Sequence, residues 1–135
     1  MISNHISLEE AIESPTAFRR GIKNVPNEEE LEAMKYVAEE LFEPIREWYG
    51  KPIKVNSFFR CHELNKAVKG SLTSGHVLGN SIDITGGNMV ENKKIFNFIK
   101  ESGLEYDQLI NEYNFTWLHI SLKKSGNRKQ VLAIK

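Results

Sequence analysis

Apolar residues recur every three or four positions through residues 31–48 and predict one long helix. Asn27 and Glu30 have the spacing of a capping box, so the helix should begin beside them. Pro44 falls inside the pattern and should kink or restart the helix, and Gly50 should end it. The apolar face consists of Leu31, Met34, Val37, Ala38, Leu41, Ile45 and Trp48. We interpret this helix as the main scaffold of the fold and assign it no chemistry.

Two further helices are predicted from the same signals in their first turns. Ser7 and Glu10 have capping-box spacing and predict a short helix, which should end before Pro15 because proline disfavours a helical residue in front of it. Asn88 should cap a third helix that stops at Gly103. The apolar face of that third helix is formed by Ile95, Phe98 and Ile99.

Alternation of apolar and polar residues predicts strands in much of the remaining chain. The five predicted strands lie at residues 53–57, 82–84, 106–112, 117–122 and 130–134. The polar stretch 61–81 should form a loop, and a Ser-Gly-Asn turn at 125–127 should lead into the last strand as a hairpin. Because helices come first and antiparallel-looking strands later, the expected fold class is α+β.

Length and charge limit what this chain can be. Its 135 residues suffice for one domain with a single hydrophobic core. We expect one domain over 1–135, with N-terminal helices packed on a small, mainly antiparallel sheet; its main part should cover about 7–122 and its hairpin strand 123–135. The 18 basic and 18 acidic residues balance, so no overall field favours nucleic acid or a membrane surface as a partner. We expect a monomer.

The cysteine count and the first residues limit chemistry and location. Cys61 is the only cysteine, which excludes an intrachain disulfide and a cysteine-based zinc site. The first ten residues lack an apolar run, and no stretch of about 20 apolar residues follows that could span a bilayer. We therefore expect no signal peptide and no membrane span, and a protein that stays in the cytoplasm as synthesised.

His76, Asp83 and His119 are the candidate metal ligands. Gly79 lies between the first two and allows a tight change of direction. Strand alternation turns Asp83 and His119 away from the predicted core, so both side chains can face one cleft with His76. Two imidazoles and one carboxylate suit a catalytic zinc ion, which keeps its fourth position for water and lowers the pKa of that water towards about 7.

These residues belong to a longer pattern. It consists of Ser57-Phe58-Phe59-Arg60, Asn65, Gly70-Ser71, Ser74-x-His76-x-x-Gly79-x-x-x-Asp83 and Trp117-x-His119-x-Ser121. The pattern resembles the M15 metallopeptidases, in particular the compact bacterial and phage members related in fold to zinc D,D-carboxypeptidases and hedgehog domains. The resemblance runs from about Ser7 to Leu122. It implies one zinc ion held by the three candidate ligands, and a substrate in the stem peptides of bacterial peptidoglycan.

The resemblance also implies roles around the metal. Arg60 would act in catalysis and substrate binding, since its fork of donors suits a terminal carboxylate or the scissile carbonyl. Ser71 and Ser74 would shape the substrate groove or support the ligands. Trp117 would form part of the cleft wall and pack against its neighbours. His5 and His62 have no partners at ligand spacing, and no base is indicated for the Cys61 thiol, so we assign none of them chemistry.

The general base departs from the family pattern. Many relatives carry an acidic residue three positions before the final histidine, but Thr116 stands there and cannot take up a proton. We expect Glu112 to be the base, brought across from His119 by a hairpin loop at 113–116; Asp107 is the fallback. In the implied hydrolysis, Glu112 takes a proton from water activated by zinc and returns it to the leaving amine.

Three functions remain open on the sequence alone. The first is an active peptidoglycan peptidase, either a D-Ala-D-Ala carboxypeptidase or an endopeptidase of stem peptides or cross-bridges. Such an enzyme could be cytoplasmic, or could reach the wall by phage lysis or as part of a virion. The second is a non-catalytic zinc-binding structural or interaction module, which Thr116 keeps open. The third is an interaction domain that holds no metal.

Overall fold

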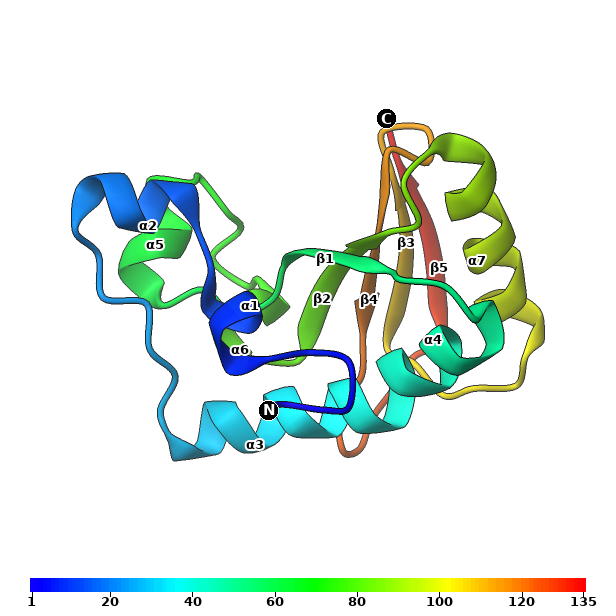
Figure 1. Cartoon of the computed structure of the whole chain (residues 1–135), viewed down its shortest axis with the longest axis horizontal. Helices are drawn as coiled ribbons and strands as arrows, with labels where there is room; N and C mark the ends of the chain where they lie inside the picture. Colours follow the sequence, from blue (N-terminus) through cyan, green and yellow to red (C-terminus); the bar gives the residue numbers. More distant parts are fainter.

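A single sheet carries the candidate site, and the strand pairing shows how. The computed structural model describes all 135 residues, Met1–Lys135, and the strand order is β1-β2-β4-β3-β5 (Figure 1). The strands are β1 (Lys54–Ser57), β2 (Ser81–Thr85), β3 (Gln108–Glu112), β4 (Trp117–Ser121) and β5 (Gln130–Ile134). The β1–β2, β2–β4 and β3–β4 pairs are antiparallel. The predicted α+β class with a mainly antiparallel sheet is confirmed.

The last strand corrects the hairpin prediction for residues 123–135. Instead of returning against β4, β5 passes to the far side of β3 and pairs with it in parallel. Contacts of Arg128 and Gln130 with Asp107 fix the position at which β5 begins. The Arg128 side chain binds Asp107 at the start of β3 with N···O distances of 2.9–3.0 Å, and the Gln130 N–H donates to the Asp107 carbonyl at 2.9 Å. These contacts join residues distant in the chain, so local turn chemistry did not reveal them.

The long predicted helix is present and is interrupted where the proline requires it. It consists of α3 (Glu28–Val37), a π-helical turn η1 (Ala38–Phe42) and α4 (Glu43–Tyr49). Asn27 and Glu30 form both capping-box hydrogen bonds, at 2.8 and 2.9 Å. Pro44 has no N–H to continue the regular pattern, and the wider turn directly before it absorbs the mismatch. The kink or restart expected at Pro44 is thus observed.

The other helices agree only in part with the prediction. α1 (Leu8–Ile12) and α7 (Met89–Glu101) lie where expected, while α2 (Pro15–Arg20), α5 (His62–Ala67) and α6 (Gly75–Leu78) were not predicted. Pro15 ends one helix but also begins the next at its first position, where its missing N–H costs nothing. α5 and α6 are too short to show a helical period.

The hydrophobic core lies between the long helix, α7 and one face of the sheet. Ile82, Ile84, Leu118, Ile120 and Leu109 supply the sheet side, each fully buried. On α7, Ile95 and Ile99 are buried as predicted. Phe98 is only partly buried and stacks on Trp48 at 4.0 Å between ring centroids, and Phe96 packs in the core instead.

The opposite face of the sheet lines a cavity, to which Asp83, Ile110 and His119 contribute. None of the helices has both the length and the apolar character needed to cross a bilayer.

Candidate metal centre

The three predicted ligands meet on the face of the sheet that lines this cavity. Asp83 in β2 and His119 in β4 are direct partners in the antiparallel register, so their side chains leave the sheet side by side. His76 comes from α6, the short helix just before β2. A register shift in β1, between Val55 and Ser57, lies directly beside Asp83. Such irregularities bend a strand and re-aim the chain that follows it, often next to functional sites.

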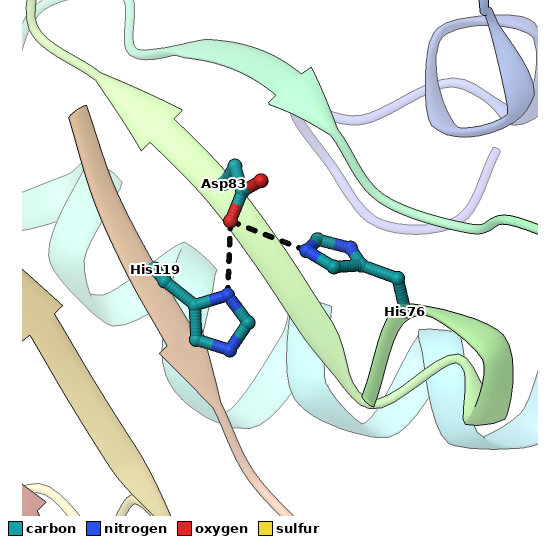
Figure 2. A group of neighbouring side chains, drawn as sticks. All are labelled: His76, Asp83 and His119. Atoms are coloured by element: carbon teal, nitrogen blue, oxygen red, sulfur yellow. Dashed lines mark hydrogen bonds and ion pairs between the residues drawn. The ribbon is translucent and has the colours of Figure 1, made fainter. Parts of the chain in front are cut away.

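One carboxylate oxygen holds both imidazoles. The Oδ1 atom of Asp83 lies 3.2 Å from Nε2 of His76 and 3.0 Å from Nδ1 of His119 (Figure 2). One ligand atom from each of the three residues lies within 4.8 Å of the others. His76 is buried, and the side chains of His119 and Asp83 are 13% and 16% exposed. The cluster is compact enough for one ion and open enough for a substrate to reach it.

The hydrogen bonding of His76 tests whether these residues fit a cation. Its Nδ1 atom lies 2.7 Å from the Phe58 carbonyl oxygen, which can only accept, so Nδ1 carries the hydrogen of the neutral ring. The Nε2 lone pair then points at the Asp83 carboxylate, which is also an acceptor. Two acceptors 3.2 Å apart need a proton or a cation between them. The donor set therefore fits a divalent metal.

The electrostatics of Asp83 favour its charged form. Burial raises the pKa of this carboxyl, but without a metal its hydrogen bonding and electrostatic attraction to the His119 and His76 imidazoles outweigh burial, and the net pKa is lowered well below its usual range. At neutral pH the Asp83 carboxylate is therefore ionised and suited to bind a cation.

Local sequence explains why His76 faces the cluster. Ser74 caps α6, and its hydroxyl accepts from the His76 N–H at 3.2 Å. Gly79 ends the helix at φ 81°, as the tight turn predicted there requires, and a Cβ at this position would lie 2.7 Å from the Glu30 carbonyl oxygen. The helix is thus fixed at both ends within one turn of the ligand.

Arg60 is positioned by a residue that the sequence did not single out. Asn24 is buried in the segment before α3. Its amide donates to the Phe59 carbonyl at 3.0 Å and accepts from the Cys61 N–H at 2.7 Å, holding the backbone on both sides of Arg60. The guanidinium reaches the Ser74 hydroxyl at 3.3 Å, and its Nε is buried without a partner. Asn24 stands alone in an irregular stretch and gave no sequence signal.

A cavity of about 510 Å³ lies over the cluster. Every residue predicted for the site lines it, namely Arg60, Ser71, Ser74, His76, Asp83, Glu112, Trp117 and His119. Lys69, Gln108, Ile110 and Tyr113 also line it and were not predicted. The Trp117 ring packs on the Tyr113 ring at 5.1 Å between centroids. Trp117 therefore lines the cavity and also packs against a neighbouring side chain. The site is an open groove with charged groups of both signs.

Glu112 lies in this cavity, although not directly across from His119. The β3–β4 register places Ile110 opposite His119 and Glu112 opposite Trp117, so Glu112 is a diagonal neighbour on the same face. Burial raises the pKa of Glu112, and the charge of Asp83 raises it further against the smaller effect of the two histidines. Its carboxylate makes no hydrogen bond, and it is free to exchange a proton.

Asp107, the alternative base, is excluded by its contacts. Arg128 binds its carboxylate at 2.9 and 3.0 Å, and Lys123 lies 3.7 Å away. The residue is buried and does not line the cavity.

The turn between Glu112 and Trp117 has an unusual backbone. Tyr113, Asn114 and Phe115 all have positive φ, at 49°, 55° and 62°. Asn92 of α7, fully buried, donates to the carbonyls of Phe115 at 2.9 Å and Thr116 at 3.1 Å and so holds this conformation. Thr116 is exposed, and its hydroxyl donates to the Tyr113 carbonyl at 2.6 Å. Strained backbone of this kind is commonly found at functional sites.

Fold and site together define a class: a small α+β protein with a carboxylate-bridged histidine pair, suited to a divalent metal, at the base of an open groove. The chain belongs to the Peptidase M15 family, whose sequence model matches residues 4–121. It is therefore a member of a family of peptidases, which are generally zinc-dependent. The resemblance drawn from the sequence is confirmed. No curated protein matches the chain in sequence.

Proposed function

We propose that this protein is a zinc-dependent peptidase that hydrolyses peptide bonds of bacterial peptidoglycan, with His76, Asp83 and His119 as its metal ligands. The observation that carries the proposal is the cluster itself, in which one atom from each ligand lies within 4.8 Å of the others inside a groove. Membership of the M15 family supports the reaction class. The peptidoglycan substrate follows from what is typical of that family.

The chain's own residues have definable tasks in this reaction. A zinc ion in the cluster would supply Lewis acidity towards water and the scissile carbonyl. Glu112, whose carboxylate has no hydrogen-bond partner and lines the groove, takes the proton of the attacking water and returns it to the leaving amine. Arg60 offers planar donors to the carbonyl oxygen or a terminal carboxylate of the substrate. Ser74 holds both Arg60 and the helix that carries His76.

The experiment combines metal analysis with turnover. Protein purified without chelator should contain one zinc ion per chain and should release new amino and carboxyl termini from purified peptidoglycan. His119→Ala should lose the metal and reduce turnover more than about 100-fold, because even residues that only support a metal ligand contribute 10- to 100-fold. His62→Ala is the matched control, since His62 is exposed and lies outside the groove. A zinc-loaded parent that releases no termini between pH 6 and 9 would exclude the peptidase.

A non-catalytic zinc module of the same fold is the second candidate. Thr116 favours it, because this position carries an acidic residue in many relatives and threonine cannot serve as a base. If added zinc raises the melting temperature by mass action but the parent hydrolyses no peptidoglycan, the non-catalytic module is supported. A chain that holds no zinc and whose melting temperature ignores added zinc would exclude both candidates and leave the domain without a metal.

A further inference from the structure

Lys69 occupies a backbone position that favours glycine. It follows the end of α5 with φ at 59°. The N–H groups of Lys69 and Gly70 donate to the carbonyls of Lys66 at 3.1 Å and Asn65 at 2.8 Å, the pair of bonds that closes a helix in the Schellman motif. Glycine is usual at this position because an L side chain is strained there.

The strain at Lys69 is not offset by any contact of its side chain. The ion pairs of other basic residues involve Lys51, Lys94, Lys123 and Arg128. Lys69 makes no ion pair and no side-chain hydrogen bond, and it is exposed. At the neighbouring position 70 only glycine fits, since a Cβ there would lie 2.0 Å from Oδ1 of Asn65. Folding alone therefore does not explain a lysine at position 69.

Lys69 lines two cavities. It lines the groove of the candidate metal centre. It also lines a second cavity of about 520 Å³, formed by residues of α2, α5 and the segments that follow them. α2 and α5 lie side by side at the end of the molecule away from β5 and α7 (Figure 1). A peptide in the groove could therefore extend past Lys69 into the second cavity.

The second cavity is positively charged. Arg20, Lys66 and Lys69 line it, against the single carboxylate of Glu63. None of the three cations forms an ion pair, although the chain as a whole has as many acidic as basic residues. Unpaired like charges concentrated at a concave surface raise the local potential and attract anions.

We propose that Lys69, together with Arg20 and Lys66, forms an anion-binding subsite that receives a carboxylate of the substrate peptide, away from the bond that is cut. Lys69 is then a specificity-determining residue that selects acidic peptides over their amides. This inference rests on the proposed peptidase function for its substrate. The subsite is separate from Arg60, which stands at the cluster itself and contacts Ser74.

The decisive variant is Lys69→Gly, because it should not harm folding. It removes the charge and at the same time supplies the residue that the backbone prefers, so its melting temperature should equal or exceed that of the parent. Lys129→Gly is the matched control. Lys129 also has a positive φ, 50°, but lies at the start of β5 and lines neither cavity.

The assay compares two peptides that differ only in one carboxylate, replaced by a carboxamide in the second. The parent and Lys129→Gly should favour the acidic peptide in kcat/KM by about 1.5- to five-fold, the range for an exposed ion pair. Lys69→Gly should bring this ratio close to one by lowering kcat/KM for the acidic peptide, while Lys69→Arg should preserve the preference. Salt at 1 M should remove the preference in the parent.

Calorimetry separates the subsite proposal from the peptidase proposal. Binding of the same two peptides is measured on proteins that also carry Glu112→Gln, so that no peptide is cleaved during the titration. Preferential binding of the acidic peptide that depends on Lys69, in a parent that cleaves nothing, would overturn the peptidase and support the subsite. Turnover by the parent with the same acid-to-amide ratio in Lys69→Gly would overturn the subsite and leave the peptidase. Inorganic phosphate that binds in a Lys69-dependent way, with no discrimination between the peptides, would overturn the assignment to a carboxylate.

Discussion

Asp107 and Glu112 stand at the two ends of the segment that contains β3, and their surroundings are opposite. Asp107 is enclosed: Arg128 donates to both of its oxygens, Lys123 approaches, and the Arg128 hydrogen bonds lower its pKa. Glu112 opens into the groove with no hydrogen bond to its carboxylate, and burial with the charge of Asp83 raises its pKa. The same functional group is thus fixed as an anion at one end and left able to exchange protons at the other.

The largest effect expected from this comparison is on catalysis at the Glu112 end. Glu112→Gln should lower kcat/KM by about 10²- to 10⁴-fold, the usual contribution of a general base. Zinc content and melting temperature should stay at parental values, because the side chain is not a ligand and makes no hydrogen bond. Steady-state kinetics and metal analysis on the same preparation check both points. A variant that keeps more than a tenth of parental activity would remove Glu112 as the base.

The pH dependence of activity should report the ionisation of Glu112. Only the ionised carboxylate can accept a proton, so kcat/KM should fall about tenfold per pH unit on the acid side. In the metal-free protein, the midpoint of Glu112 titration followed by NMR should lie above the ordinary glutamate value of about 4.3, because burial and Asp83 disfavour the charge. The residual activity of Glu112→Gln should lack the acid limb. A midpoint at or below the ordinary value in the metal-free protein would contradict this effect of burial and Asp83.

At the other end, Asp107→Asn should change stability rather than chemistry. Loss of the charged hydrogen bonds to half-exposed Arg128 should lower the free energy of unfolding by about 1–2 kcal/mol, with kcat/KM within about twofold of the parent.

Because the folded pKa of Asp107 is lowered, its stabilisation is present above the ordinary aspartate pKa of about 3.9 and is lost as the pH falls. Urea unfolding at pH 7 and pH 3 should show a smaller difference between variant and parent at pH 3. An equal difference at both values would contradict the ion-pair account.

The smallest effect is expected at the position where relatives carry their acid. Thr116→Glu should change kcat/KM by less than about threefold, since Thr116 is exposed on the turn and does not line the groove. It should cost about 1 kcal/mol of stability, because the hydroxyl no longer donates to the Tyr113 carbonyl. The double variant E112Q/T116E should remain as inactive as Glu112→Gln. Recovery of activity in the double variant would show that the turn can place a base at 116.

The orientation of each candidate ligand could be predicted from sequence because it is set by local structure. Strand alternation put Asp83 and His119 on the face opposite the core, and the glycine before β2 allowed the turn that presents His76. That the three residues share one metal was implied by the resemblance to the M15 family. The capped helices were predictable for the same reason, since each cap joins residues three apart.

The supports of the site were not predictable, because each joins segments distant in the chain. Asn24 holds the backbone around Arg60, and Asn92 holds the turn after Glu112. A single asparagine outside a cap has no period or spacing that marks such a role. The placement of β5 beside β3 depends on the pairing of Arg128 with Asp107, which local turn rules do not contain.

That placement of β5 has a consequence for engineering. The family match ends at residue 121, yet the segment beyond it supplies the outer neighbour of the strand that carries Glu112, and the Tyr113 N–H donates to the Ile134 carbonyl at 2.7 Å. Removing or tagging the last residues would leave every groove-lining residue in the sequence. It would still weaken the support of the strand that carries Glu112.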